Sequence, residues 1–73
     1  MAHLTSREYD SLERAITEGR RIAVVRRGRE FVVVPLRLYM QSGREIIDTR
    51  HPTTGDPLTF TIDEVECIEV VLW

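Results

Sequence analysis

The chain has 73 residues, and its ten basic and twelve acidic side chains give a net charge of −2 at pH 7. This length allows a single hydrophobic core, and a domain of this size buries only about 60% of its unfolded surface, which favours self-association. The composition excludes a disordered chain, and no run of about 18 apolar residues is present to span a membrane. Because the start lacks the apolar run of a secretory signal and Cys67 is the single cysteine, we expect one cytoplasmic domain, residues 1–73.

The first element predicted is an amphipathic helix over about residues 5–18. Thr5 and Glu8 have the spacing of a capping box, in which each side chain bonds the other residue's backbone amide. Gly19 is suited to end the helix in the left-handed conformation. An apolar stripe predicts that one side of the helix packs on a sheet; it consists of Tyr9, Leu12, Ala15 and Ile16.

Five short strands are predicted after the helix. They span about residues 21–26, 30–39, 45–50, 58–62 and 65–72. Arg27-Gly28 and Ser42-Gly43 are typical of tight hairpin turns. Pro35 interrupts the longest strand, and because proline cannot donate a ladder hydrogen bond, we expect an edge or a bulge there, with the strand bent.

Alternation in the longest strand predicts which side chains share a face. Phe31 and Val33 fall on one face. The other face is predicted to carry Val32, Val34, Leu36 and Leu38. One helix and five strands with short connections predict a mostly β fold, and a meander of this size usually closes into a five-stranded SH3/Sm-like barrel.

Charge is distributed unevenly along the chain. Residues 19–44 are rich in arginine, and residues 45–73 are rich in aspartate and glutamate. This asymmetry indicates either a surface that faces phosphate groups or strands of opposite charge that pair with one another. The candidate phosphate-binding residues flank the first predicted strand and its turn; they are Arg20, Arg21, Arg26, Arg27 and Arg29. The alternative without ligand binding is a solvated strand edge whose charges prevent aggregation.

Several short motifs, taken in order, resemble the WYL domain, an Sm-like β-barrel of bacterial transcriptional regulators. The motifs span roughly residues 9–71 and are Leu12, Ala15-Ile16, Arg20-Arg21-Ile22, Val34-Pro35-Leu36, Gly43-Arg44 and Phe60-Thr61-Ile62-Asp63-Glu64-Val65. The resemblance implies a regulatory module that binds nucleotide or nucleic acid. The order of elements is similar, more weakly, to that of Sm and Hfq proteins, which form RNA-binding rings.

The chain departs from the WYL pattern at the family's ligand-binding positions. Glu45-Ile46-Ile47 stands at the Trp-Tyr-Leu signature, and Thr61 and Glu64 replace two arginines. These replacements remove one stacking ring and two phosphate-pairing cations. The resemblance therefore implies the fold and a regulatory role, and the arginines of the first hairpin become the candidate ligand site.

No residue constellation predicts an enzyme, a cofactor or a metal. His51 lies near Asp48 and Asp56, but no second histidine or cysteine is close, so we interpret this segment as a structural loop. We expect Cys67 to be a buried, unreactive thiol.

Apolar residues of the last predicted strand indicate an alternative function, self-association or protein binding. Val71 and Trp73 point away from its predicted inward face, and exposed apolar groups at a chain end usually pack onto something. We expect them to form an oligomer interface, so a self-associating or protein-binding domain is the rival to a nucleic-acid-binding module.

Overall fold

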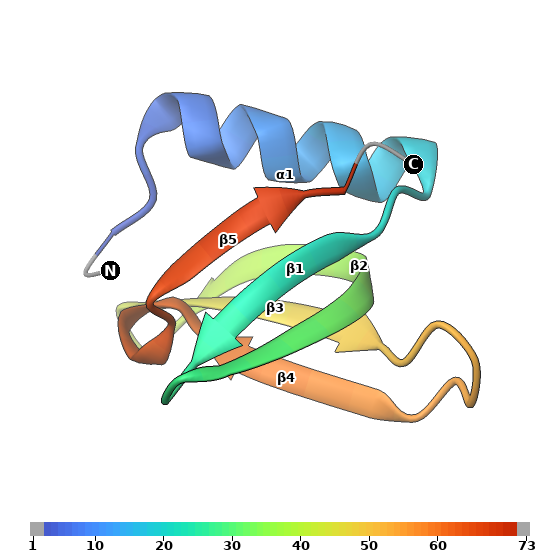
Figure 1. Ribbon diagram of the computed structural model, residues 1–73. Coiled ribbons are helices and arrows are strands. Elements are labelled where there is room, and N and C mark those ends of the chain that lie inside the picture. Colours follow the sequence, from blue (N-terminus) through green and yellow to red (C-terminus); the bar gives the residue numbers. More distant parts are fainter. Residues whose placement is uncertain (1–2, 72–73) are drawn as a thin grey trace.

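The computed structural model describes residues 3–71, which form one helix and five antiparallel strands (Figure 1). The elements in order are α1 (Ser6–Glu18), β1 (Ile22–Arg26), β2 (Arg29–Gln41), β3 (Arg44–Arg50), β4 (Pro57–Thr61), the 3-10 turn η1 (Ile62–Glu64) and β5 (Cys67–Val70). The predicted mostly β fold with an N-terminal helix is confirmed. The last strand begins at Cys67 rather than near residue 65, because the chain is still turning at Val65 and Glu66 after η1.

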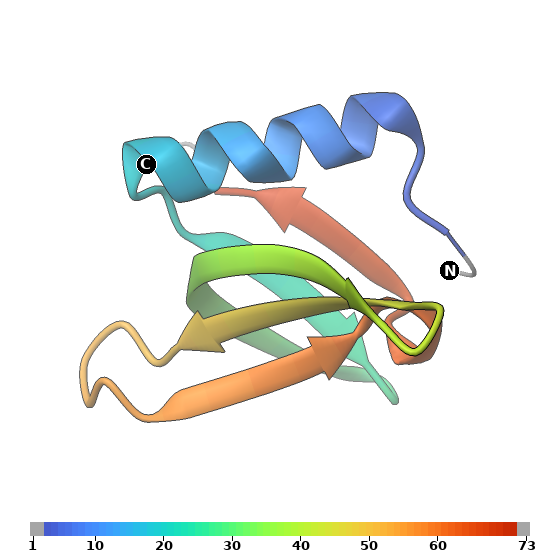
Figure 2. The ribbon, with the colours of Figure 1, turned by 180° about the vertical axis from the view of Figure 1, so that it is seen from behind.

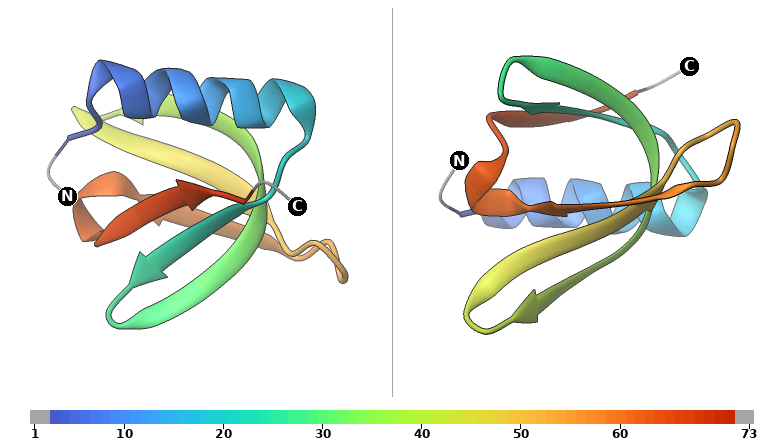
Figure 3. Two further views of the ribbon diagram at one scale, coloured as in Figure 1. Left: turned by 45° about the horizontal axis from the view of Figure 1, so that its top comes forward. Right: turned by 90° about the horizontal axis from the view of Figure 1, so that it is seen from below.

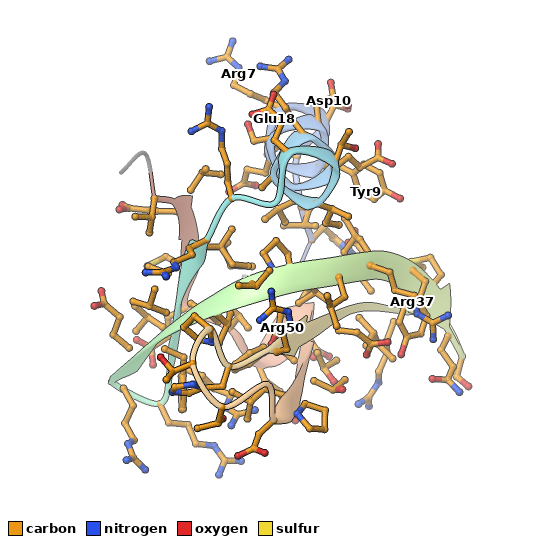
Figure 4. The ribbon with its side chains drawn as sticks, turned by 90° about the vertical axis from the view of Figure 1, so that its right-hand side faces the viewer. Arg7, Tyr9, Asp10, Glu18, Arg37 and Arg50 are labelled. Carbon is orange, nitrogen blue, oxygen red and sulfur yellow. The ribbon has the colours of Figure 1, made fainter. Side chains whose placement is uncertain are left out.

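Helix α1 begins and ends where its capping residues predict. The Thr5 hydroxyl accepts a bond from the Glu8 amide at 3.1 Å, and the Glu8 carboxylate accepts one from the Thr5 amide at 2.9 Å. Gly19 has φ of 69°, the left-handed conformation that stops the helix. Arg7, Asp10 and Glu18 project from the side of the helix that faces away from the sheet (Figure 4). At 13 residues, α1 is the longest helix in residues 3–71, and it lacks the length and apolar character to cross a membrane.

The strands form one sheet in the order β4-β3-β2-β1-β5. Each neighbouring pair is antiparallel, and β4 and β5 lie at the two edges. Within residues 3–71 no hydrogen-bonded pairing joins β4 to β5, so the sheet is strongly curved but open, and barrel closure stays a prediction. Figure 3 shows β2 sweeping across the molecule and contributing to both halves of the sheet.

Strand β2 bends at a bulge that follows Pro35. The register of β2 against β3 pairs Pro35 with Thr49 and then Arg37 with Asp48, so Leu36 is the extra residue. The bulge reverses the alternation: Val33 and Pro35 are buried before it, and Leu38 packs on the core after it. The predicted bulge is thus confirmed, but the prediction that Leu36 and Leu38 share a face is wrong, because Leu36 is 48% exposed whereas Leu38 packs on the core.

The core lies between the helix and the concave side of the sheet (Figure 2). Every element except β5 contributes a buried side chain to it. These side chains are Leu12, Ala15, Ile22, Val24, Val33, Ile47, Phe60 and Ile62, together with Val65 from the segment before β5. Burial of this apolar surface is the dominant favourable term in folding. Tyr9, predicted to be on the same helical stripe, is 36% exposed at its margin.

Candidate nucleic-acid interface

The β1–β2 hairpin carries three of the five predicted arginines on one protruding turn. Arg26 ends β1 and Arg29 begins β2, and the two residues are cross-strand partners. Arg27 and Gly28 between them have φ of 53° and 74°. Positive φ at both central residues belongs to the two-residue turn whose twist matches that of the flanking strands. The tight turn therefore brings Arg26, Arg27 and Arg29 together; we call this segment, residues 26–29, the hairpin tip.

Two phenylalanine rings hold arginine side chains at the base of the hairpin tip. The Arg26 guanidinium carbon lies 4.8 Å from the Phe60 ring centroid and 5.4 Å from that of Phe31. Arg29 lies 6.0 Å from the Phe31 centroid, and the two rings are 5.5 Å apart. Cations within about 6 Å of a ring face are attracted by its negative charge density. This attraction offsets the repulsion between Arg26 and Arg29, since like charges directly opposite on two strands destabilise a sheet.

The arginines of the hairpin tip are not neutralised by carboxylates. In residues 3–71 the ion pairs within 4.0 Å are His3–Glu45, Arg20–Glu18 and Arg37–Asp48, and none involves Arg26, Arg27 or Arg29. No ion pair in residues 3–71 thus joins these arginines to the acidic strands, and neutralisation by the acidic strands of another subunit stays a prediction. The guanidinium groups of the tip therefore make no ion pair in the described residues, and binding of an anion there stays a prediction.

Arg20 and Arg21 lie away from the hairpin tip. They precede β1, whereas the tip begins at its last residue, Arg26, so an extended strand separates Arg21 from Arg26 by about 16 Å. Arg20 is paired with Glu18, and the Arg21 carbonyl accepts a bond from the Val71 amide at 2.9 Å. The five predicted arginines thus form two groups. In the described part of the chain Arg20 is ion-paired, whereas Arg21, like the three arginines of the tip, has no ion pair.

A second polar cluster lies on the exposed side of β2, β3 and β4 and was not predicted. Asp48 Oδ2 accepts a bond from Arg37 Nε at 3.0 Å, and Asp48 Oδ1 accepts bonds from Tyr39 at 3.2 Å and Thr59 at 3.1 Å. The Arg37 guanidinium also covers the Tyr39 ring at 4.4 Å. Arg37 lies toward the far end of β2 in Figure 4. Strand register is the signal that would have revealed this cluster, because Arg37, Asp48 and Thr59 are successive cross-strand partners.

The cluster shifts the pKa of its charged members in opposite directions. Partial burial of Asp48 works to raise its pKa, but the hydrogen bonds from Arg37, Thr59 and Tyr39 outweigh it, so the pKa of Asp48 is lowered. The hydrogen bond to Asp48 raises the pKa of Arg37 above its usual value. Because these groups satisfy one another, we interpret the cluster as a structural brace across three strands.

The residues at the WYL ligand positions have local structural roles. Glu45 Oε1 accepts a bond from the Leu4 amide at 3.2 Å and so ties the segment before α1 to β3. Ile47 is buried in the core, and Glu64 is exposed in η1. At these positions the chain presents an acceptor and an aliphatic side chain rather than a stacking ring.

His51 lies in the loop between β3 and β4, and Cys67 lies at the start of β5. His51 Nδ1 accepts bonds from the Thr53 and Thr54 amides, both at 3.1 Å, which fits the predicted structural loop. Cys67 is exposed at the start of β5, so the prediction of a buried thiol is wrong; the strand is an edge and leaves this side chain in solvent. Across residues 3–71 no group of three or more His, Cys, Asp or Glu side chains is placed to hold a metal ion.

An apolar groove lies beside β5. It has a volume of about 320 Å³ and runs between the first half of α1 and β5. Leu4, Leu12, Ile68 and Val70 supply its apolar walls. Val71, predicted at an oligomer interface, is half-buried at the end of β5, and Trp73 lies outside the described residues.

Comparison with known proteins finds no matching family model, no matching curated protein and no matching solved structure. The WYL-like interpretation therefore stays a prediction that depends on the motifs quoted above.

Proposed function

We propose that this protein is a non-enzymatic binding module that takes the phosphate groups of single-stranded nucleic acid or nucleotides at the hairpin tip. The observation that supports this function is the grouping of Arg26, Arg27 and Arg29 on one protruding turn without an ion-pair partner in residues 3–71. Arginine presents a planar fork of donors that matches phosphate oxygens. Since Phe31 and Phe60 hold Arg26 in place, less side-chain entropy is lost when it binds.

The proposed mode of binding is electrostatic contact with phosphates, without reading of base sequence. Phe60 is fully buried and the Arg26 guanidinium covers both rings, so neither ring is free to stack on a base. The tip instead offers guanidinium edges directed at phosphates. If three phosphates are neutralised, the logarithm of the binding constant falls with the logarithm of salt with a slope of about −2 for a single strand.

Fluorescence anisotropy with labelled single-stranded RNA and DNA at low and moderate salt tests this proposal. We expect Arg27→Ala and Arg29→Ala to weaken binding and to lower the salt slope by about 0.7 each. Arg44→Ala is the matched control, because Arg44 flanks the other two-residue hairpin turn and its loss changes the net charge equally. Absence of binding at low salt, or an equal effect of Arg44→Ala, would refute the proposal.

Self-association is the second candidate function, and the free edge of β5 favours it. β5 pairs with β1 alone within the described sheet, and an unpaired edge is a template for another strand. The apolar groove beside it would be covered by a partner. This candidate predicts an oligomer in light scattering that Trp73→Ala dissociates, while Leu36→Ala, which shortens an exposed apolar side chain on β2, leaves it intact. A monomer at all concentrations would contradict it.

A further inference from the structure

The backbone at the hairpin tip already binds an anion, and that anion belongs to the chain itself. The Gly28 amide donates a hydrogen bond to Glu66 Oε1 at 2.9 Å, across 38 residues of sequence. Glu66 precedes β5, and its own amide is fixed by a bond of 2.7 Å to the Val25 carbonyl. Glu66 is thus held beside the turn at two points: its backbone amide bonds to Val25, and its carboxylate bonds to Gly28.

The Gly28 amide is a donor that the turn itself leaves open. In a two-residue turn the flanking residues, here Arg26 and Arg29, make the ladder bonds, and the central amides point out of the ladder. Successive backbone amides in a turn can form a concave site that favours anions. A backbone donor with three arginines around it is a suitable place for a phosphate oxygen.

Glu66 satisfies this donor without pairing with the arginines. In residues 3–71 no guanidinium lies within 4.0 Å of the Glu66 carboxylate, so the arginines keep their donors free while the amide is occupied. A phosphate that takes both the guanidiniums and the amide must first displace the carboxylate, because two anions cannot share one donor at this distance.

We propose that Glu66 is a built-in competitor at the hairpin tip, which a phosphate group displaces from the Gly28 amide when it binds. This inference rests on the proposed function and adds where the phosphate oxygen is held and what limits its affinity. The bound phosphate bonds to the Gly28 amide and to the guanidiniums of the tip, and the Glu66 side chain moves into solvent. The competitor keeps affinity for phosphate low until several contacts form at once.

Two variants of Glu66 and one control test the competition. Glu66→Gln removes the charge and keeps the shape, and Glu66→Ala removes the acceptor. We expect both to raise the affinity for a labelled oligothymidylate by roughly 5- to 10-fold, since hydrogen bonds to charged groups are the stronger ones. Glu30→Gln is the matched control: Glu30 is exposed, adjacent to Arg29, and its loss changes the net charge equally. Long-range charge alone should change affinity less than about twofold.

The Gly28 amide provides a direct readout by NMR. Titration of the wild-type chain with oligothymidylate should shift its amide resonance and saturate with the Kd measured by anisotropy. Titration with AMP in a second arm should shift the same resonance, and comparison of its Kd with that of oligothymidylate shows whether a terminal nucleotide phosphate or the phosphodiester backbone of a strand binds more tightly. Thermal melting of each variant confirms that it is folded.

The outcomes separate this inference from the proposed function. If the wild type binds, but Glu66→Gln and Glu30→Gln change affinity equally, or the Gly28 resonance stays fixed at saturation, the competitor role is refuted and the proposed function remains. If no chain binds either probe at low salt, both are refuted.

Discussion

Replacing Arg26 should cost stability as well as binding, because this arginine is part of the packing at the edge of the core. Its guanidinium lies 4.8 Å and 5.4 Å from the Phe60 and Phe31 ring centroids. A cation over an aromatic face is worth about 0.5–1 kcal/mol at an exposed site, so contacts with two rings contribute about 1–2 kcal/mol. Loss of the repulsion between Arg26 and Arg29 offsets this cost by about 0.2 kcal/mol or more. Arg26→Ala is therefore expected to destabilise the protein by about 1 kcal/mol.

Thermal unfolding followed by circular dichroism measures this effect. For a domain of this size, a loss of 1 kcal/mol lowers Tm by about 4–8 °C. Arg27→Ala is the control: Arg27 is exposed in the turn and no ring contact holds it in the described structure, so its Tm should change little. An equal Tm for Arg26→Ala and the wild type would refute the packing role that we assign to this guanidinium.

Two further predictions concern the Asp48 cluster across β2, β3 and β4, and Gly28 in the hairpin tip. The pKa of Asp48 is lowered in the folded state, so its stabilising effect is complete above its unfolded pKa of about 3.9 and is lost as pH falls through the lower folded pKa. Asp48→Asn should therefore lower the free energy of unfolding by about 1 kcal/mol at pH 7 in urea titrations. If the difference between the variant and the wild type is unchanged at about pH 2, this reasoning is contradicted. Gly28 has φ of 74° and an added Cβ would meet no atom within 4 Å, so Gly28→Ala should cost only the backbone strain of about 1–2 kcal/mol. Gly28→Asn should cost less, and equal melting curves for the two variants would count against a purely backbone effect.

The parts of the fold that the sequence predicts are those set by local chemistry. The capping box of Thr5 and Glu8 fixes the start of α1, and the glycines after Arg27 and Ser42 fix two hairpin turns. Each depends on hydrogen bonds or dihedral angles within a few residues, so the residue types are enough to specify it.

Features that depend on strand register are not predicted from the sequence. The bulge after Pro35 was expected, but its effect on Leu36 was not, because one extra residue reverses which side chains face the core. The Asp48 cluster likewise requires the alignment of three strands. Cys67 was predicted as buried from its place in an apolar strand, whereas burial depends on whether that strand is internal or at an edge.

The candidate site shows the same division between local and long-range determinants. The sequence identifies the arginines but cannot show that β1 separates Arg20 and Arg21 from the hairpin tip. Nor can it show that Glu66, distant in sequence, lies against Gly28.

The acidic residues of 45–73 could have neutralised the arginines of the hairpin tip, but in the described structure they form no ion pair with them. Within residues 3–71, the ion pair that joins this acidic segment to the arginine-rich segment, residues 19–44, is Asp48–Arg37, and Arg37 lies in the part of β2 that follows the bulge. The contact of the acidic segment with the tip itself is a carboxylate on a backbone amide rather than on a guanidinium. A solvated strand edge that charge protects against aggregation would also carry arginines without ion pairs. The two interpretations therefore differ in the salt dependence of nucleic-acid binding, which only the phosphate-binding tip predicts.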